Sequence, residues 1–431
     1  MIRGFAAALA LSLLSTAALA DAPAPAPYDW TGLYAGASLG LASANGTAAD
    51  LDFYNYAETT RTYSSSIMGS LDAGYNLQRG NIVYGVEADL GVLDAGRHYE
   101  FYGPSYEPCA YCSTSRIGAL GSARARVGVA FDKALIYATG GLAFGQVNNR
   151  WEYTGVKASD NGWKTGYAVG AGIDYAVSPS WTVRAEGIYY ALEATTVGST
   201  SPTNSFRFKN TAQVARLGVN YSFDAKSMAD GAASEAVSWT GPYVGASAGR
   251  VTAKGGSDDL DNYDYSRNYI SASSSAIASV DAGYNLQMDS LVYGIEADIG
   301  KLRAISHEKW YDGGYKDCDY CMVNSISALG SVRGRLGYAF DKALFYATAG
   351  LAFGNVNNRW EESGSIKAIE NEWRTGVAVG AGVDYALTQN WVVKAEGMRY
   401  DLGSKTVTEN DYRFQFSNRA DVFRMGVNYN F

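Results

Sequence analysis

The chain has 431 residues, a net charge of −8 at pH 7 and a mean hydropathy of −0.15. This modest acidic balance, without any basic cluster, argues against a nucleic-acid partner. Glycine (49) and tyrosine (33) are abundant and proline is scarce (8), which does not suggest disorder. A mildly polar average with many glycines and tyrosines fits a transmembrane β-barrel, whose lumen face is polar.

The first 20 residues predict a secretory signal peptide. Arg3 precedes an apolar run from Phe5 to Leu14, and Ala18-Leu19-Ala20 forms a small-residue cleavage site. The run is well short of the ~20 residues of a membrane-spanning helix, and no other segment approaches that length. The sequence therefore excludes a helical membrane protein. Residues 21–29 are rich in proline and alanine and predict an extended tail.

The rest of the chain is a tandem duplication of Trp30–Phe223 and Trp239–Phe431. WTGLYAGASLG in the first copy corresponds to WTGPYVGASAG in the second, and VYGVEADLG corresponds to VYGIEADIG. A period near 200 residues is too long for a solenoid repeat, so each copy should be a complete domain. The polar, small residues of Asp224–Ser238 between the copies predict a flexible linker.

The sequence of each copy predicts eight antiparallel strands. In the first copy, tight turns at 79–81, 132–134 and 179–180 alternate with longer polar connections near 45–62, 101–113, 154–163 and 199–210. Short turns at one end and long loops at the other are typical of an outer-membrane up-and-down β-barrel, with the long loops extracellular. The fold class is therefore all-β, as two eight-stranded barrels. The alternative is one sixteen-stranded barrel built from both halves, which would act as a porin-like channel for small solutes. The predicted strands are 30–44, 63–78, 82–100, 114–131, 135–153, 164–178, 181–198 and 211–223.

Alternation assigns the two faces of each strand. In 82–100, Tyr84, Val86 and Leu90 point one way, and Glu87 and Asp89 point the other. The sixth segment places Ile173, Tyr175 and other apolar residues opposite a glycine-rich face that carries Asp174. A narrow eight-stranded lumen requires small residues, whereas a soluble sandwich does not require its polar face to be so rich in glycine.

The inward faces collect opposite charges in nearly equal numbers. A balanced set inside one small cylinder predicts a salt-bridge network that fills the lumen. The alternative is a selectivity lining for an ion path. The predicted network comprises Asp72, Glu87, Asp89, Arg124, Arg126, Asp174, Arg184, Glu186 and Arg216 in the first copy, and Asp281, Glu296, Asp298, Arg333, Arg335, Asp384, Lys394, Glu396 and Arg424 in the second.

Aromatic residues bracket the strands. We expect Trp30, Trp181, Tyr221 and Phe223 to form a periplasmic girdle and Trp151, Tyr153 and Trp163 an outer one, at the two headgroup levels. The last segment, Val422–Phe431, alternates strictly, and its twin is Val214–Phe223. We predict that both close a barrel, with the apolar face of the last segment toward lipid.

These blocks resemble the small opacity-type outer-membrane barrels, which include the outer membrane immunogenic proteins and related porin family proteins of Gram-negative bacteria. The resemblance rests on WTGLYAG, GYNLQ…VYGVEADLG, RARVGVAFDKALIYATGGLAFG and RLGVNYSF, and it covers nearly all of both copies. It implies an eight-stranded barrel in the outer membrane, inserted by an assembly machinery that recognises a C-terminal aromatic such as Phe431. It also implies envelope-stabilising or loop-presenting roles. The tandem copy departs from the usual single barrel.

Four cysteines form two C-x-x-C pairs in the second predicted extracellular loop of each copy: Cys109 with Cys112, and Cys318 with Cys321. In a secreted protein we expect a local disulfide in each loop. A four-thiolate metal site shared between the loops and a redox role are the alternatives.

The two histidines, His98 and His307, occupy matching positions near the outer end of the third strand. A catalytic role would pair His98 with Glu100 or Asp94, but no catalytic motif accompanies them. We expect no enzyme activity, cofactor or metal. The expected partners are outer-membrane lipid and lipopolysaccharide, the assembly machinery, and host or surface molecules at the loops.

Overall fold

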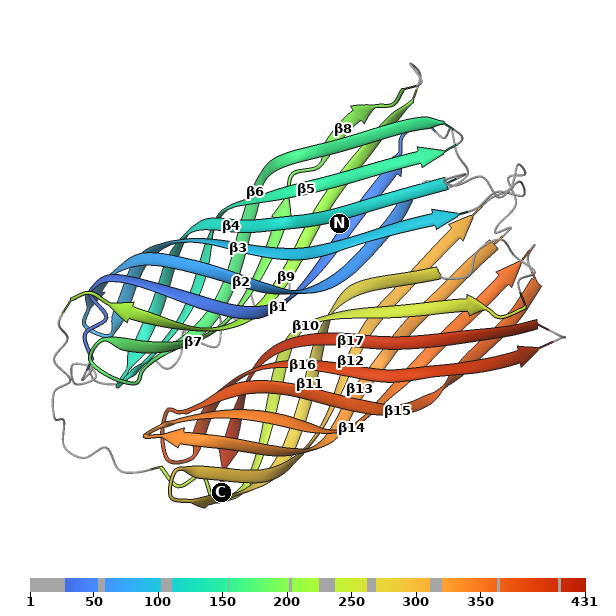
Figure 1. Ribbon diagram of the computed structural model, residues 1–431. Coiled ribbons are helices and arrows are strands. Elements are labelled where there is room, and N and C mark those ends of the chain that lie inside the picture. Colours follow the sequence, from blue (N-terminus) through green and yellow to red (C-terminus); the bar gives the residue numbers. More distant parts are fainter. Residues whose placement is uncertain are drawn as a thin grey trace, which may run out of the picture.

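The computed structural model describes residues 28–52, 59–101, 111–153, 155–200, 204–224, 237–261, 269–310, 320–362, 365–409 and 412–431. These residues form two antiparallel barrels, which lie side by side in Figure 1. None of the described residues belongs to a helix long and apolar enough to cross a membrane. The predicted signal peptide, the proline-rich tail up to residue 27 and residues 225–236 of the predicted linker lie outside the described residues.

The first barrel contains eight long strands and one short one. Each strand pairs with its neighbour in the chain, and β9 returns to β1 with Ala42 opposite Val214, which closes the sheet. The strands are β1 (Gly32–Asp50), β2 (Thr59–Arg79), β3 (Ile82–Phe101), β4 (Tyr111–Phe131), β5 (Ala134–Tyr153), β6 (Val156–Ala176), β7 (Trp181–Leu192), β8 (Thr195–Gly198) and β9 (Ser205–Ser222).

The second barrel closes in the same way from eight strands. β17 pairs with β10, with Val251 opposite Val422. Its strands are β10 (Gly241–Asp259), β11 (Tyr269–Met288), β12 (Leu291–Trp310), β13 (Tyr320–Phe340), β14 (Ala343–Glu362), β15 (Ser365–Ala386), β16 (Trp391–Glu409) and β17 (Tyr412–Asn430).

Two separate seams confirm the two-barrel prediction and exclude the single sixteen-stranded barrel. A larger barrel would require β9 to pair with β10, whereas β9 completes its hydrogen bonding with β1 and β17 does so with β10. The physical reason is that a closed sheet has no edge strand left to pair.

Two details of the predicted strands were wrong. The third long loop, expected at 154–163, is a tight connection, because Tyr153 pairs with Val156 and the strand starts there. The seventh segment, predicted as 181–198, breaks after Leu192, and the short β8 continues along β9 alone. The equivalent strand of the second barrel, β16, accommodates the same region with a register shift between Asp401 and Ser404.

The predicted faces are confirmed on β3. Val86 is 61% exposed and Val92 is 69% exposed on the outside, whereas Glu87 and Asp89 are buried inside. The apolar side chains thus face outward, as a lipid-facing band requires.

Candidate functional site

The lumen of each barrel is filled by layers of side chains. In the first barrel, inward residues of β4 pass from Arg126 and Arg124 near the short turns, through Leu120 and Ile117, to Ser115 toward the long loops. Because the same order recurs on the other strands, a charged layer lies below an apolar layer.

The charged layer of the first barrel unites all nine predicted residues. Arg124 pairs with Glu87 at 2.6 Å, with Asp89 at 3.1 Å and with Glu186 at 2.9 Å. Arg216 completes the contacts of Glu186 at 2.6 Å and of Asp89 at 3.2 Å. All these groups are buried, so the predicted network is present as interlocked ion pairs.

Arg184 connects the remaining acids of this layer. Its guanidinium reaches Asp72 at 3.0 Å, Glu87 at 2.6 Å and Asp174 at 2.9 Å. Arg126 also pairs with Asp174, at 2.8 Å. Desolvating charges is costly, and it is tolerable here because Glu87, Asp89, Asp174 and Glu186 each pair with at least two guanidinium groups and Asp72 pairs with one.

The second barrel repeats the network with one chemical difference. Arg333 bridges Glu296, Asp298 and Glu396, and Arg424 pairs with Asp298 at 2.9 Å and Glu396 at 2.6 Å. Lys394 occupies the place of Arg184 and reaches Asp281 at 3.2 Å and Glu296 at 2.9 Å. Asp384 is held by Arg335 at 2.7 Å. A single ammonium therefore replaces a three-way guanidinium contact.

Sequence reasoning missed the tyrosines of this layer. The hydroxyl of Tyr34 donates to Glu87 at 2.6 Å and accepts from Arg126 at 2.9 Å, and Arg126 lies 3.8 Å from the ring centroid of Tyr137. In the second barrel Tyr243 likewise donates to Glu296 and accepts from Arg335, and the Arg335 guanidinium lies over the ring of Tyr346. The alternation of β1 carries the signal, because Tyr34 shares its face with Gly36 and Ser38.

Above the charges lies an apolar layer that the sequence analysis also missed. In the first barrel it includes Met68, Leu120, Ile117, Val147 and Ile188, all buried. Its counterpart in the second barrel includes Leu329, Ile326 and Val356. The sequence did carry a signal for this layer, because these large apolar residues lie on the inward faces of the strands, which otherwise carry small residues.

Aromatic residues close both ends of the first lumen, and this corrects two predicted girdle positions. Trp30 is buried at the periplasmic end against Tyr28, with ring centroids 4.8 Å apart. Trp151 is buried at the outer end and stacks on Phe206 at 4.1 Å. Both indoles are therefore packed inside the barrel and not on its lipid-facing surface. Trp181, Tyr221, Phe223 and Trp163 are exposed on the outside, as a girdle requires.

A family model described as "Outer membrane protein beta-barrel domain" matches residues 6–223 and again residues 226–431. The chain belongs to this family. Its two matches coincide with the two copies, and members of the outer membrane protein beta-barrel domain family reside in the outer membrane, which gives the location of this chain.

Curated relatives align with a segment of this chain about as long as one copy. The 31 kDa outer-membrane immunogenic protein of Brucella melitensis is 31% identical over 205 residues, which is 45% of this chain and 84% of that protein. The 22 kDa outer membrane protein of Rhizobium leguminosarum bv. viciae is 30% identical over 194 residues, 45% of this chain and 79% of that protein. Among solved structures, Neisserial surface protein A matches at 18% identity and TM-score 0.23, over 44% of this chain and 98% of that one.

The loop residues singled out in the sequence are only partly described. Cys112 and Cys321 are disulfide-bonded, whereas Cys109 and Cys318 lie outside the described residues. His98 and His307 lie on β3 and β12, and their side chains and that of Tyr153 are outside the description. Within the described ranges, no group of three or more His, Cys, Asp or Glu side chains is placed to hold a metal ion.

The two barrels contact each other through outward residues that the alternation assigned to lipid. Ile173 and Ala185 of the first barrel form one buried cluster with Val383 and Ala395 of the second, and Met425 packs against it. Tyr175 and Tyr385 form a second cluster nearer the short turns. These positions are therefore covered by protein, not lipid. Alternation gives the side of the sheet but not what covers it.

Proposed function

We propose that this protein is a structural, loop-presenting component of the outer membrane whose two lumens are closed to solutes. The observation that carries the proposal is the packing of each lumen: nine buried charges in mutual ion pairs, with an apolar layer above them. An ion would have to displace these pairs, and the barrel is only wide enough for its own side chains.

The surface role is supported by the long strands and by the relatives. The strands extend beyond the apolar band toward the long-loop end, and that end carries the disulfide-bonded Cys112 and Cys321. The Brucella relatives are named immunogenic outer-membrane proteins. We propose that the loops are presented to host or surface partners, that the barrels contact lipid and lipopolysaccharide, and that the assembly machinery reads the aromatic Phe431.

Planar-bilayer recording of the full chain tests closure. We expect no stable conductance steps beyond the bare bilayer at neutral pH, with a general porin as the positive control in the same lipid. Reproducible steps from the folded protein would contradict the proposal. Folding is checked on the same sample by the mobility shift that unheated barrels show in gel electrophoresis. We also expect no catalytic activity.

A further inference from the structure

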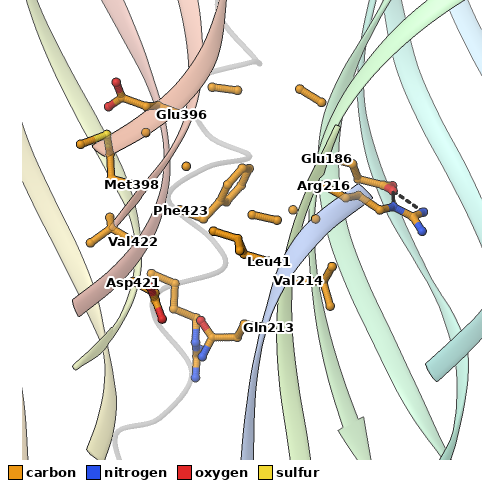
Figure 2. Close-up of a pocket in the computed structure, with 18 of the residues that line it drawn as sticks. Leu41, Glu186, Gln213, Val214, Arg216, Glu396, Met398, Asp421, Val422 and Phe423 are labelled. Atoms are coloured by element: carbon orange, nitrogen blue, oxygen red, sulfur yellow. Dashed lines mark hydrogen bonds and ion pairs between the residues drawn. The ribbon is translucent and has the colours of Figure 1, made fainter. Parts of the chain in front are cut away.

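A groove of about 570 Å³ lies between the two barrels, above the cluster of Ile173 and Val383 and below the hydrogen bond from Gln213 to Ser274 (Figure 2). Its walls are mostly apolar outward residues from both barrels, including Leu39 and Leu217 of the first and Val379 and Phe423 of the second. This volume lies in the range of sites that bind small molecules. Both walls belong to the membrane-facing surface, so the adjoining medium is lipid.

Close packing of the barrels forms the floor of the groove. A side-chain carbon on Gly187 would lie 2.2 Å from the Phe423 ring, so the ring rests directly on the backbone of β7. The matching position of the first copy is Ala215, and a side-chain carbon on Gly397 would meet it only at 3.8 Å. The two copies meet through equivalent positions. The Phe423 ring fills the space at Gly187, whereas the smaller Ala215 leaves the equivalent space at Gly397 open.

Charged residues gather at one end of the groove, all from the second barrel. Asp421 accepts from Arg399 at 2.7 Å and pairs with Lys254 at 3.5 Å. Arg250 brings a third cation, and its guanidinium carbon lies 4.7 Å from the ring centroid of Tyr189 on the first barrel. The first-barrel groups beside it, Ser43, Gln213 and Tyr189, are uncharged, and the Ser43 hydroxyl donates to Asp421 at 3.3 Å.

Arg250 is the cation left over at this end. Three cations face one carboxylate, and within the described ranges no carboxylate lies at ion-pair distance from Arg250. Its side chain is exposed, and the first copy has Leu41 at the same place. An exposed arginine on the outward face of a membrane strand is costly unless an anion meets it.

The depth of this end matches the outer headgroup level. Arg399 lies eight residues beyond Trp391 on β16, and Trp391 is the exposed second-copy counterpart of the girdle residue Trp181. At ~3.3 Å per residue and a tilt of about 40°, eight residues rise ~20 Å. The apolar band of such barrels is about 25 Å tall. Arg399 therefore lies in the outer part of the apolar band, near the level where an outer-leaflet lipid changes from acyl chain to headgroup, and Arg250 lines the same end of the groove.

We propose that the groove binds one acyl lipid of the outer leaflet whose phosphorylated headgroup carries a net negative charge, with an acyl chain between the barrels and the phosphate at Arg250. The apolar walls take the chain, and Arg250, already positioned by the Tyr189 ring, takes the anion. The site exists only because two copies lie side by side, so a single-barrel fragment lacks it. The inference is independent of whether the lumens conduct.

Native mass spectrometry of the full chain in detergent tests the site. The probes are dioleoyl phosphatidylglycerol, whose headgroup is anionic, and dioleoyl phosphatidylcholine, which has the same chains and no net charge. We expect one phosphatidylglycerol per chain to bind at least tenfold more tightly than phosphatidylcholine. Equal affinity for the two lipids would overturn the proposal.

Two variants and a matched control locate the binding. Arg250→Leu introduces the residue that the first copy has at this position and should remove the preference for phosphatidylglycerol. Arg303→Ala removes an exposed arginine of β12 outside the groove and should leave that preference unchanged. Ala215→Phe places a ring in the open space at Gly397 and should weaken retention of both lipids. Equal effects of the two arginine changes, or no effect of Ala215→Phe in a folded variant, would overturn the proposal.

Discussion

The hydroxyl of Tyr385 donates a hydrogen bond of 2.7 Å to the backbone carbonyl of Phe131 in the other barrel. The converse bond, from Tyr175 to the carbonyl of Phe340, is 3.0 Å long. Beside them, Lys133 pairs with Asp341 and Lys342 pairs with Asp132 at 3.2 Å. The two copies thus meet as a two-fold dimer does, each offering the same patch to the other.

Zero-length carbodiimide coupling should therefore join the barrels at these turns. We expect two cross-linked peptide pairs, Lys133 with Asp341 and Lys342 with Asp132, identified by mass spectrometry of the folded protein. Lys133→Arg keeps the ion pair but removes the reactive amine, so only the first product should disappear. The double change Tyr175→Phe and Tyr385→Phe removes about 1 kcal/mol per hydrogen bond and should lower both yields. The absence of both products from the folded wild type would contradict this interface.

Breaking the lumen network should destabilise a barrel strongly. Arg184→Met removes the buried ion-pair partner of Asp72 and one of the buried partners of Glu87 and of Asp174. We expect a loss of about 3–5 kcal/mol in the free energy of unfolding, because the carboxylates remain desolvated. Arg116→Met is the matched control, since the ion pair of Arg116 with Asp94 is exposed and should be worth at most about 1 kcal/mol. Denaturant titration in lipid vesicles, followed by tryptophan fluorescence, compares the two, and similar losses would count against the network.

The first copy should fold without the second. A fragment of residues 21–223 contains the whole β1–β9 seam and the Tyr28–Trp30 cap. We expect a heat-modifiable barrel, detected as a faster band in unheated gel electrophoresis. A fragment starting at residue 31 loses the cap and should unfold at lower denaturant concentration. Failure of the longer fragment to fold in vesicles that fold the full chain would refute autonomy of the domain.

The second barrel has an acid-sensitive contact between Asp261, just beyond the end of β10, and Arg413 at the start of β17. Asp261 accepts hydrogen bonds from the Arg413 guanidinium at 2.6 Å and from the Arg413 amide at 2.7 Å. The hydrogen bond from the Arg413 side chain lowers the pKa of the Asp261 carboxyl. Because the folded-state pKa lies below that of a free aspartate (about 3.9), the contact contributes fully above that value and is lost as the pH falls through the lowered one.

Hydrogen exchange of the Arg413 amide measures this contact. We expect protection, relative to the intrinsic rate at each pH, to hold at neutral pH and to fall below about pH 4. Asp261→Asn should reduce protection at all pH values. In the first barrel Asp52 accepts the Ser205 amide and, among the described residues, no arginine, so Asp52→Asn is the matched control. Protection that does not change with pH would contradict the role of the carboxylate.

The cysteine pairs give a mass-spectrometric prediction. Tryptic cleavage at Arg97 and Arg116 leaves Cys109 and Cys112 in one peptide, and cleavage at Lys316 leaves Cys318 and Cys321 in another. With local disulfides, each unreduced peptide should appear alone and lighter by two hydrogens than its reduced form. A linked pair of the two peptides would show a bond between the loops instead.

The sequence by itself determined the strand pattern, the duplication and the residues that face each lumen. Period-two alternation is local, so Glu87, Arg124 and Glu186 could be placed inside before any contact was known, and the glycine-rich inner face indicated a narrow barrel. The inward Trp30 and Trp151 were missed because alternation does not say where a lumen has room for a ring.

Only the tertiary structure decided how the two copies associate. The sequence pattern around the outward residues Ile173, Tyr175 and Phe423 would be the same whether lipid or protein covered them, because both surroundings are apolar. The seams β1–β9 and β10–β17 likewise depend on pairing between residues far apart in the chain, which strand propensity does not encode. The groove and its unpaired Arg250 follow from that association, so no local pattern could reveal them.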